Sequence, residues 1–395
     1  MKETDTQIDF ITEHMGEDLT RLLLSAARYP QIDVPFAVEQ IAARRQIREK
    51  LPSWYANPAL LFPAKIAAEQ CSSEQTALYK QRLVTTDQTL CDLTGGLGID
   101  SYFFSRKVKK VTYIERFDAY CSVARRNFIA LGVDNIEVMF GNSSELIAGL
   151  PSLDVFYIDP ARRGEGNKRV FALADCEPDL PALLPRLLAK AEWVIAKLSP
   201  MADIQLTLEL LCATVEVHVL AVRNECKELL FVMKRGGELT EPVVTCVNYA
   251  PDGSEVLFSF FLSEERNAPS ALSDGVGGYL YEPNASVLKA GAFKCVGTRF
   301  GLKKLQVSSH LYTSNHPVEG FPGRAFCVEA VLPFSSRFCK ELARVLPQAN
   351  ITVRNFPLSV DELRKRTKIK DGGGIYLFAT TLQDGSKVLI RCVKI

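Results

Sequence analysis

The segment Cys91–Asp100 reads CDLTGGLGID, and it decides the fold. The run Thr89–Leu93 predicts a short buried strand, and Ile99–Val108 predicts the helix that follows. Three glycines lie in the turn between them, at Gly95, Gly96 and Gly98. Glycine lets a backbone turn tightly and approach a ligand without a side chain in the way. The segment therefore predicts the start of a nucleotide-type pocket, with a tight turn that binds nothing as the alternative.

Two further predicted strands also end in polar residues. Val111–Ile114 leads to Glu115, and Asp154–Ile158 leads to Asp159–Arg162, which reads Asp-Pro-Ala-Arg. Open α/β sheets bind ligands at the carboxyl ends of their parallel strands. We therefore expect these polar residues to meet at one edge of a parallel sheet.

The polar residues suit a cationic ligand that carries a ribose. Glu115 lies about 20 residues past the glycine turn, where an acid can accept hydrogen bonds from ribose hydroxyls. Asp92 precedes the glycines, and a carboxylate there would repel a pyrophosphate but attract a cation. There is no Gly-Lys-Ser/Thr, so a Walker-type phosphate loop is excluded. The combination indicates S-adenosylmethionine, although each acid alone is also compatible with a solvated loop.

The order of these signals resembles the class I methyltransferases. They share Asp-x-x-Gly-Gly-x-Gly, an acid after the second strand, and a polar residue after the third, here Ile136–Phe140. The resemblance implies that Asn142, with Ser143 beside it, holds the adenine edge, unless both only bond to their own turn. The expected cofactor-binding residues are Asp92, Thr94, Gly95, Gly96, Gly98, Glu115, Asn142, Ser143 and Asp159.

The Asp-Pro-Ala-Arg segment is the predicted catalytic signal. Pro160 fixes its own φ and favours an extended Asp159, which directs a carboxylate and several carbonyls toward the donor. The segment resembles the Asp/Asn-Pro-Pro-Tyr/Phe of amino methyltransferases and the Asp-Pro-Pro-Arg of pyrimidine C5 methyltransferases. It departs from both motifs because Ala161 replaces the second proline, and from that of the amino methyltransferases also because Arg162 replaces the aromatic residue. A loop that merely ends the strand is the alternative.

Three mechanisms are compatible with these residues. In the first, Asp159 and nearby carbonyls hold a target amine in line with the methyl donor. The second is covalent and needs a cysteine two residues before Pro200, but Leu198 occupies that position, so we set it aside. The third resembles ribose 2′-O methyltransferases, with the set Lys65, Asp159, Lys197 and Glu225 or Glu228. The expected catalytic residues are Asp159, Pro160, Arg162 and Lys197.

Two basic segments are candidates for substrate phosphates. Arg163 lies in a cationic loop that contains glycines, and arginine pairs well with phosphate or carboxylate. Arg364 and Arg366 lie on a predicted helix, Ser359–Thr367, where they would position an RNA without reading its sequence. An ordinary exposed loop and a solvated helix face are the alternatives.

The composition is that of a globular protein with two to four domains. The 395 residues are 47% hydrophobic and 24% charged, and their net charge of +1 does not by itself indicate a nucleic-acid binder. Residues 351–395 hold nine Lys/Arg and four Asp/Glu, a net charge of +5. The 11 cysteines include no Cys-x-x-Cys pair, so we expect reduced thiols, no metal and a cytoplasmic location. We expect no membrane span or signal peptide either.

The expected fold class is α/β, a Rossmann-like sheet with an N-terminal helical region and C-terminal α+β domains. The helical region covers residues 1–85, and its polar segment Glu69–Lys80 is expected either to line the pocket or simply to start a capped helix. The α/β domain covers 86–262. A linker at Glu264–Asp274 opens a smaller segment, 263–320, and 321–395 forms the last domain.

The whole chain resembles a bacterial family, typified in Bacteroidetes, that joins a class I methyltransferase domain to a small ferredoxin-like segment and a THUMP-like domain. The matching stretches are Glu69–Lys80, Asp92–Gly98, Asp159–Arg162, Asn224–Leu229, Tyr281–Pro283, Arg354–Leu358 and Asp371–Gly374. The resemblance implies methyl transfer from S-adenosylmethionine, and the THUMP-like domain implies RNA as the partner.

Three functions follow from the sequence. The first is an RNA methyltransferase acting on a base nitrogen by direct in-line transfer. The second is a methyltransferase for a protein or a small molecule, and the third is an inactive protein that binds RNA or the cofactor.

Overall fold

The computed structural model describes residues 5–162, 173–335, 342 and 344–395. The chain forms two compact units. The first comprises Met1–Thr214 with Phe231–Leu239, and the second comprises Val215–Leu230 with Thr240–Ile395. Arg163, one of the predicted substrate-binding residues, lies outside the described residues. The domain boundaries named above stay a prediction.

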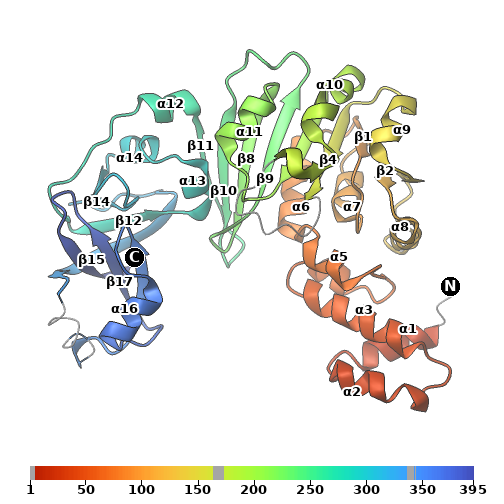
Figure 1. Ribbon diagram of the computed structural model, residues 1–395, viewed down its shortest axis with the longest axis horizontal. Helices are drawn as coiled ribbons and strands as arrows, with labels where there is room; N and C mark the ends of the chain where they lie inside the picture. Colours follow the sequence, from red (N-terminus) through yellow and green to blue (C-terminus); the bar gives the residue numbers. More distant parts are fainter. Residues whose placement is uncertain (1–4, 163–172, 336–341, 343) are drawn as a thin grey trace. The chain divides into compact units, whose positions relative to one another are not determined.

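The first unit begins with helices, as the sequence predicts (Figure 1). They are α1 Asp5–Glu13, α2 Leu19–Leu24, α3 Val34–Ile47, α4 Pro52–Tyr55, α5 Lys65–Gln70 and α6 Glu74–Lys80. Asp33 caps α3 by accepting a hydrogen bond from the Phe36 backbone. Trp54, which is fully buried, belongs to an apolar cluster that includes Leu97 of the glycine-rich turn and Phe103 of the helix Ile99–Ser105. This cluster attaches the helical region to the glycine-rich turn.

A parallel sheet follows, and along the chain its strands alternate with helices. Its elements are β1 Thr89–Asp92, α7 Ile99–Ser105, β2 Lys110–Glu115, α8 Asp118–Ala130, β3 Ile136–Phe140, α9 Ser143–Leu146, β4 Val155–Ile158, β5 Ala161–Arg162, β6 Cys176–Glu177, α10 Leu180–Lys190, β7 Trp193–Leu198 and α11 Ile204–Leu210. The strand order is β3-β2-β1-β4-β7, and every pair among them is parallel. The segment of β9 (Glu225–Lys234) in this unit lies beyond β7.

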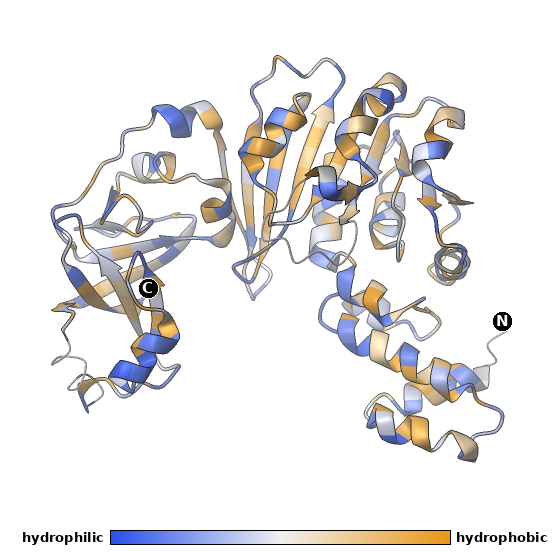
Figure 2. Ribbon diagram, viewed as in Figure 1, coloured by the Kyte–Doolittle hydropathy of each residue, from blue (hydrophilic) through white to orange (hydrophobic). Residues whose placement is uncertain are grey.

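The sheet is apolar where helices cover it. Strands such as β4 are orange in Figure 2, and all four residues of β4 are buried. Phe104 of α7 packs in one cluster with Val111 and Tyr157, and α8 adds Phe128 against Tyr113. Because β1 lies between β2 and β4, the chain reverses direction across the sheet at β1 and β4. Ligands of open α/β sheets bind at such a switch point, beyond the carboxyl ends of the strands.

The second unit holds β-hairpin strands, among them the antiparallel pair β10 and β11, and a separate seven-stranded sheet. The elements are β8 Thr214–Val222, the rest of β9, β10 Val243–Tyr249, β11 Glu255–Phe261, α12 Leu262–Asn267, β12 Tyr279–Pro283, α13 Ala285–Ala290, α14 Cys295–Arg299, β13 Lys303–Lys304, β14 Tyr312–Ser314, β15 Gly323–Pro333, β16 Asn350–Arg354, α16 Val360–Thr367, β17 Ile375–Thr381 and β18 Lys387–Lys394. The second sheet has the order β13-β14-β12-β15-β18-β17-β16. Helix α12 corrects one expectation, because the first part of the expected linker Glu264–Asp274 is helical.

A buried carboxylate joins three strands of this second sheet. Glu282 on β12 is 2% exposed. Its Oε1 accepts hydrogen bonds from the guanidinium of Arg354 on β16, at 2.9 Å and 3.1 Å, and its Oε2 pairs with Arg324 on β15. We call these three residues the Glu282 clamp. The clamp connects parts of the sequence that are about seventy residues apart.

Within the described residues, no helix is both long and apolar enough to cross a membrane.

Candidate active site

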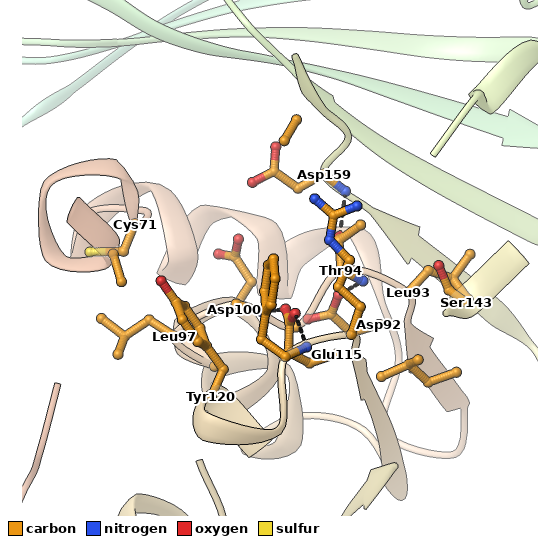
Figure 3. Close-up of a pocket in the computed structure, with 18 of the residues that line it drawn as sticks. Cys71, Asp92, Leu93, Thr94, Leu97, Asp100, Glu115, Tyr120, Ser143 and Asp159 are labelled. Carbon is orange, nitrogen blue, oxygen red and sulfur yellow. Dashed lines mark hydrogen bonds between the residues drawn. The ribbon is translucent and has the colours of Figure 1, made fainter. Parts of the chain in front are cut away.

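A pocket lies at the carboxyl ends of the parallel strands of the first unit (Figure 3). Its walls come from the turns after β1, β2, β3 and β4, from β7, and from the link between α5 and α6. The sequence-predicted residues that line it are Asp92, Thr94, Gly95, Gly96, Gly98, Glu115, Asn142, Ser143, Asp159 and Lys197. The structure thus brings together residues that are spread over more than one hundred positions of the chain.

The glycine turn is closely packed beneath the pocket. A Cβ on Gly95 would lie 2.2 Å from the ring of Tyr113, and the Tyr113 hydroxyl donates to the Gly96 carbonyl at 2.6 Å. Gly98, with φ +83°, is the residue before the first turn of α7. A side chain at Gly95 or Gly98 would displace this backbone, which forms the floor of the pocket.

Glu115 is held by two backbone donors at the end of β2. Its Oε2 accepts from the Gly96 N–H and its Oε1 from the Phe117 N–H, both at 2.9 Å. The side chain lies beside the glycine turn in Figure 3. A carboxylate has about four acceptor sites, so two remain for ligand hydroxyls. The carboxylate therefore fits the predicted ribose contact.

Asp92 lies beneath the pocket and is 1% exposed. Its Oδ1 accepts from the Thr94 N–H at 3.0 Å and its Oδ2 from the Ser101 hydroxyl at 2.6 Å. Burial raises the pKa of Asp92 to about 7, against the effect of these hydrogen bonds. A cation bound above it would favour the ionised form.

The turn after β3 gives a mixed result. Asn142 caps α9, because its Oδ1 accepts from the Ser144 N–H at 3.0 Å. This is the turn-bonding arrangement that the sequence left open as an alternative. Asn142 nevertheless lines the pocket, as does the buried Ser143. Their contact with adenine stays a prediction.

Asp159 and Lys197 form an ion pair inside the pocket. The Lys197 Nζ lies 2.5 Å from the Asp159 carboxylate. The Asp159 side chain is 38% exposed, whereas that of Lys197 is 12% exposed. The Asp159 N–H donates to the Thr94 hydroxyl at 2.7 Å, which connects the turn after β4 to the turn after β1. Pro160 is buried and does not line the pocket.

The sequence missed a group of polar residues next to this pair. Asp100 on α7 contacts Lys80 at 2.7 Å, the Tyr157 hydroxyl at 2.7 Å and the Ser72 hydroxyl at 2.8 Å. Gln70, Cys71 and Ser72 line the pocket, which confirms one expectation for Glu69–Lys80. Ser73 also caps α6, so both readings of that segment hold. The missed residues are Lys80, at the end of the polar segment Glu69–Lys80, and Asp100, in the first turn of the predicted helix Ile99–Val108.

Cys71 is the cysteine of this wall of the pocket. Burial raises the pKa of its thiol, although Lys50 and Lys197 oppose that shift. The thiolate is the nucleophilic form of cysteine, so this environment does not prepare Cys71 for covalent catalysis.

Three candidates of the expected 2′-O set, Lys65, Glu225 and Glu228, do not line the pocket. Lys65 is exposed, pairs with Glu69 at 3.4 Å and does not line the pocket. Glu225 and Glu228 belong to the second unit, where Glu225 pairs with Lys227 at 2.7 Å. The pocket of the first unit therefore contains only Asp159 and Lys197 of the expected 2′-O set. Arg162 lies on β5, but its side chain is outside the described part of the structure.

The basic helix α16 presents its two arginines differently. Arg364 donates to the backbone carbonyls of Ala349 and Ile369, both at 3.3 Å, and pairs with Asp371. Arg366 is exposed. Phosphate contact by either arginine stays a prediction. Among the described residues there is no group of three or more His, Cys, Asp or Glu side chains that could hold a metal ion.

A protein of known structure shares this architecture over the whole chain. A candidate methyltransferase from Porphyromonas gingivalis W83, known from its crystal structure, is 38% identical, with 100% of both chains covered and a TM-score of 0.89. A ferredoxin-like domain model matches residues 279–322, and a THUMP domain-like model matches residues 323–394. The chain belongs to the class I S-adenosylmethionine-dependent methyltransferases with a carboxyl-terminal THUMP-like domain.

Two further relatives of this methyltransferase agree. An uncharacterized S-adenosylmethionine-dependent methyltransferase of Mycobacterium tuberculosis is 25% identical over 361 residues, which are 89% of this chain and 94% of the relative. An uncharacterized RNA methyltransferase of Clostridium tetani is 31% identical over 97 residues, which are 24% of this chain and 21% of the relative. The protein is therefore an enzyme, and S-adenosylmethionine is its cofactor.

Proposed function

We propose that this enzyme methylates a base nitrogen of an RNA by direct in-line transfer. The observation that carries the proposal is the carboxylate of Asp159, which follows β4, lines the pocket and is oriented by Lys197 at 2.5 Å. An oriented acceptor at this point is what a target amine needs for correct alignment.

The pocket residues fit the cofactor. The turn around Gly95 and Gly98 has no side chains that would block a ligand, and Glu115 keeps two acceptor sites for ribose hydroxyls. Asp92 lies beneath, where its carboxylate would favour the cationic part of the ligand. When bound, S-adenosylmethionine supplies an electrophilic methyl group on its sulfonium.

Asp159 then acts through position and charge. Its carboxylate accepts a hydrogen bond from the N–H of the target amine, so the nitrogen lone pair points along the line of attack. The Lys197 ammonium balances the charge of the carboxylate and holds it in place as a hydrogen-bond acceptor. The proton that the methylated nitrogen loses passes to water.

Three observations support RNA as the substrate. The THUMP domain-like match covers residues 323–394, and the Clostridium tetani relative is named as an RNA methyltransferase. The segment 351–395 also carries a net charge of +5. Basic side chains that neutralise phosphates supply most of the sequence-independent affinity for a nucleic acid.

The substrate can be tested directly. We expect nucleosides from the total RNA of a deletion strain to lack one methylated base that its parent contains, as measured by mass spectrometry. The gene for the intact enzyme should restore that base, whereas the Asp159→Ala gene should not. A strain whose RNA nucleosides are unchanged, but which lacks methylation of a protein or small molecule, would overturn the RNA assignment.

The role of Asp159 needs a separate measurement. We expect Asp159→Ala to lose transfer while S-adenosylhomocysteine still binds with near-parental affinity in calorimetry. Asp154→Asn is the control, because Asp154 lies at the opposite end of β4, where it accepts from Thr89 at 2.7 Å. Full activity of Asp159→Ala would remove Asp159 from the mechanism.

A further inference from the structure

The carboxylate of Asp100 is the centre of a buried polar network next to the active site. Oδ1 pairs with Lys80 at 2.7 Å, and Oδ2 accepts from Tyr157 at 2.7 Å and from Ser72 at 2.8 Å. The Asp100 side chain is only 10% exposed. Its partners come from α6, from the link before α6, and from β4. The network therefore connects the N-terminal helical region to the parallel sheet at the pocket.

The network is costly, which argues for a role beyond folding. Lys80 is 1% exposed, and a buried ammonium destabilises a fold unless it is paired and hydrogen-bonded. Lys80 satisfies this condition with Asp100 and with the Ser72 hydroxyl, at 2.8 Å. Apolar residues of similar size often stabilise a protein as well as a buried ion pair does.

The network continues to the catalytic pair through Lys197. The Lys197 Nζ lies 3.9 Å from the Asp100 carboxylate, 3.2 Å from the Ser72 hydroxyl and 2.5 Å from Asp159. A lysine side chain has four flexible carbons, so one ion pair alone would leave it many conformations. Contacts with Ser72 and Asp100 restrict Lys197 to the conformation that reaches Asp159.

Asp100 keeps its charge for this purpose. Burial by itself would raise the pKa of Asp100, but Lys80, Lys197 and the hydrogen bonds from Lys80 and Tyr157 outweigh it and lower the pKa to about 2. The carboxylate is thus ionised at every pH at which the enzyme would work.

We propose that Asp100 is a positioning residue for methyl transfer, which holds Lys197 against Asp159 and is itself held in place by Lys80, Ser72 and Tyr157. This inference rests on the proposed role of Asp159. Asp100 also lines the pocket, but the role proposed for it is to act through Lys197.

A double-mutant cycle tests the order of action. We expect Asp100→Asn to lower kcat by about 10²-fold, since a small misplacement of a catalytic group has effects of this size. The KM for the methyl donor should change much less. In a Lys197→Met background, Asp100→Asn should cause little further loss, because residues that act in one chain are not additive. Equal losses in both backgrounds would overturn the proposal.

Two further variants keep the test sharp. Tyr157→Phe removes one donor to Asp100 and keeps the ring, so we expect a smaller loss of kcat that also disappears in the Lys197→Met background. Tyr157→Phe can test the proposal even if Asp100→Asn does not fold. Asp154→Asn, the same substitution outside the pocket, should keep the parental kcat.

A structural readout separates this inference from the proposed function. In crystals of Asp100→Asn or Tyr157→Phe, we expect the Lys197 Nζ to have moved out of contact with Asp159. Lys197 unmoved in both variants would overturn the proposal, whatever the substrate is. If Asp159→Ala is inactive while Asp100→Asn keeps parental kcat, only the positioning role is wrong. If Asp159→Ala is fully active, the role of Asp159 is wrong as well.

Discussion

Gly95 shows how closely the cofactor turn is packed. Because Gly95 has no side chain, there is room for the buried ring of Tyr113. The hydroxyl of Tyr113 donates a hydrogen bond to the Gly96 carbonyl. We expect Gly95→Ala to destabilise the enzyme by about 1–3 kcal/mol, the usual effect of overpacking. Cofactor affinity should fall too, as measured by calorimetry with S-adenosylhomocysteine. Gly149→Ala is the control, since an added Cβ there meets no atom within 4 Å.

Glu115 provides the test of the predicted ribose contact. We expect Glu115→Gln to weaken S-adenosylhomocysteine binding by about tenfold, because an amide replaces one acceptor oxygen with a donor that faces a backbone N–H. Calorimetric titration measures the change. Glu137→Gln, at an exposed residue paired with Lys110, should bind like the parent. Unchanged affinity in Glu115→Gln would refute the ribose assignment.

Asp92 gives a prediction for pH. Its pKa is about 7 in the folded enzyme against 3.8 in the absence of burial, so the folded state keeps a proton that the unfolded state has lost. The free energy of unfolding should therefore decrease as the pH rises from about 4 to 7, by up to about 4 kcal/mol. Denaturant unfolding of the ligand-free enzyme should show this decrease.

Asp92→Asn isolates the contribution of Asp92, because other groups titrate in the same range. We expect the variant to unfold with a smaller decrease between pH 5 and pH 7.5 than the parent. Parallel curves for the two proteins would contradict the prediction.

At the scale of elements, the sequence predicted the strands around the pocket well. Thr89–Leu93 and Ile136–Phe140 became β1 and β3, because short apolar runs bounded by glycine or polar residues fit a parallel sheet. The sequence failed at the first part of the expected linker, where Glu264 accepts a hydrogen bond from the Phe261 backbone and pairs with Arg299, and so supports helix α12. The contact with Phe261 is local and that with Arg299 is distant in sequence, and hydrophobic periodicity predicts neither of them.

The candidate site could likewise be predicted only in part. Residues directly after the strands could be predicted, since topology places strand ends together. The contact between Asp100 and Lys80 could not, because each residue lies on a helix whose packing partner the sequence does not reveal. Their contact depends on how α6 packs against α7, and no spacing in the chain encodes that.

Helix α16 yields a prediction that separates its two arginines. We expect Arg366→Glu to weaken RNA binding and to reduce the slope of affinity against salt by about one or two charges. Arg364→Glu should also lower stability, since Arg364 bonds to two backbone carbonyls. Filter binding at several salt concentrations measures the first effect. Lys107→Glu, an exposed change in the first unit, is the control, and an equal loss there would contradict a specific role for α16.

For the whole molecule, the Glu282 clamp predicts how the second unit unfolds. We expect Glu282→Gln to destabilise that unit by about 2 kcal/mol, because two guanidinium groups lose a buried charged partner. Hydrogen exchange of the full chain should show faster exchange in β12, β15 and β16, with the first unit unchanged. Glu319→Gln, at an exposed position near the same sheet, should have no such effect.

The clamp also bears on the ancestry of the chain. The ferredoxin-like and THUMP-like matches meet between Pro322 and Gly323, yet β12 from one and β15 from the other pair along five residues of a single sheet. A recombination event that moved either segment alone would leave a bare strand edge and an orphaned charge. We therefore expect the two segments to have been inherited together as one unit.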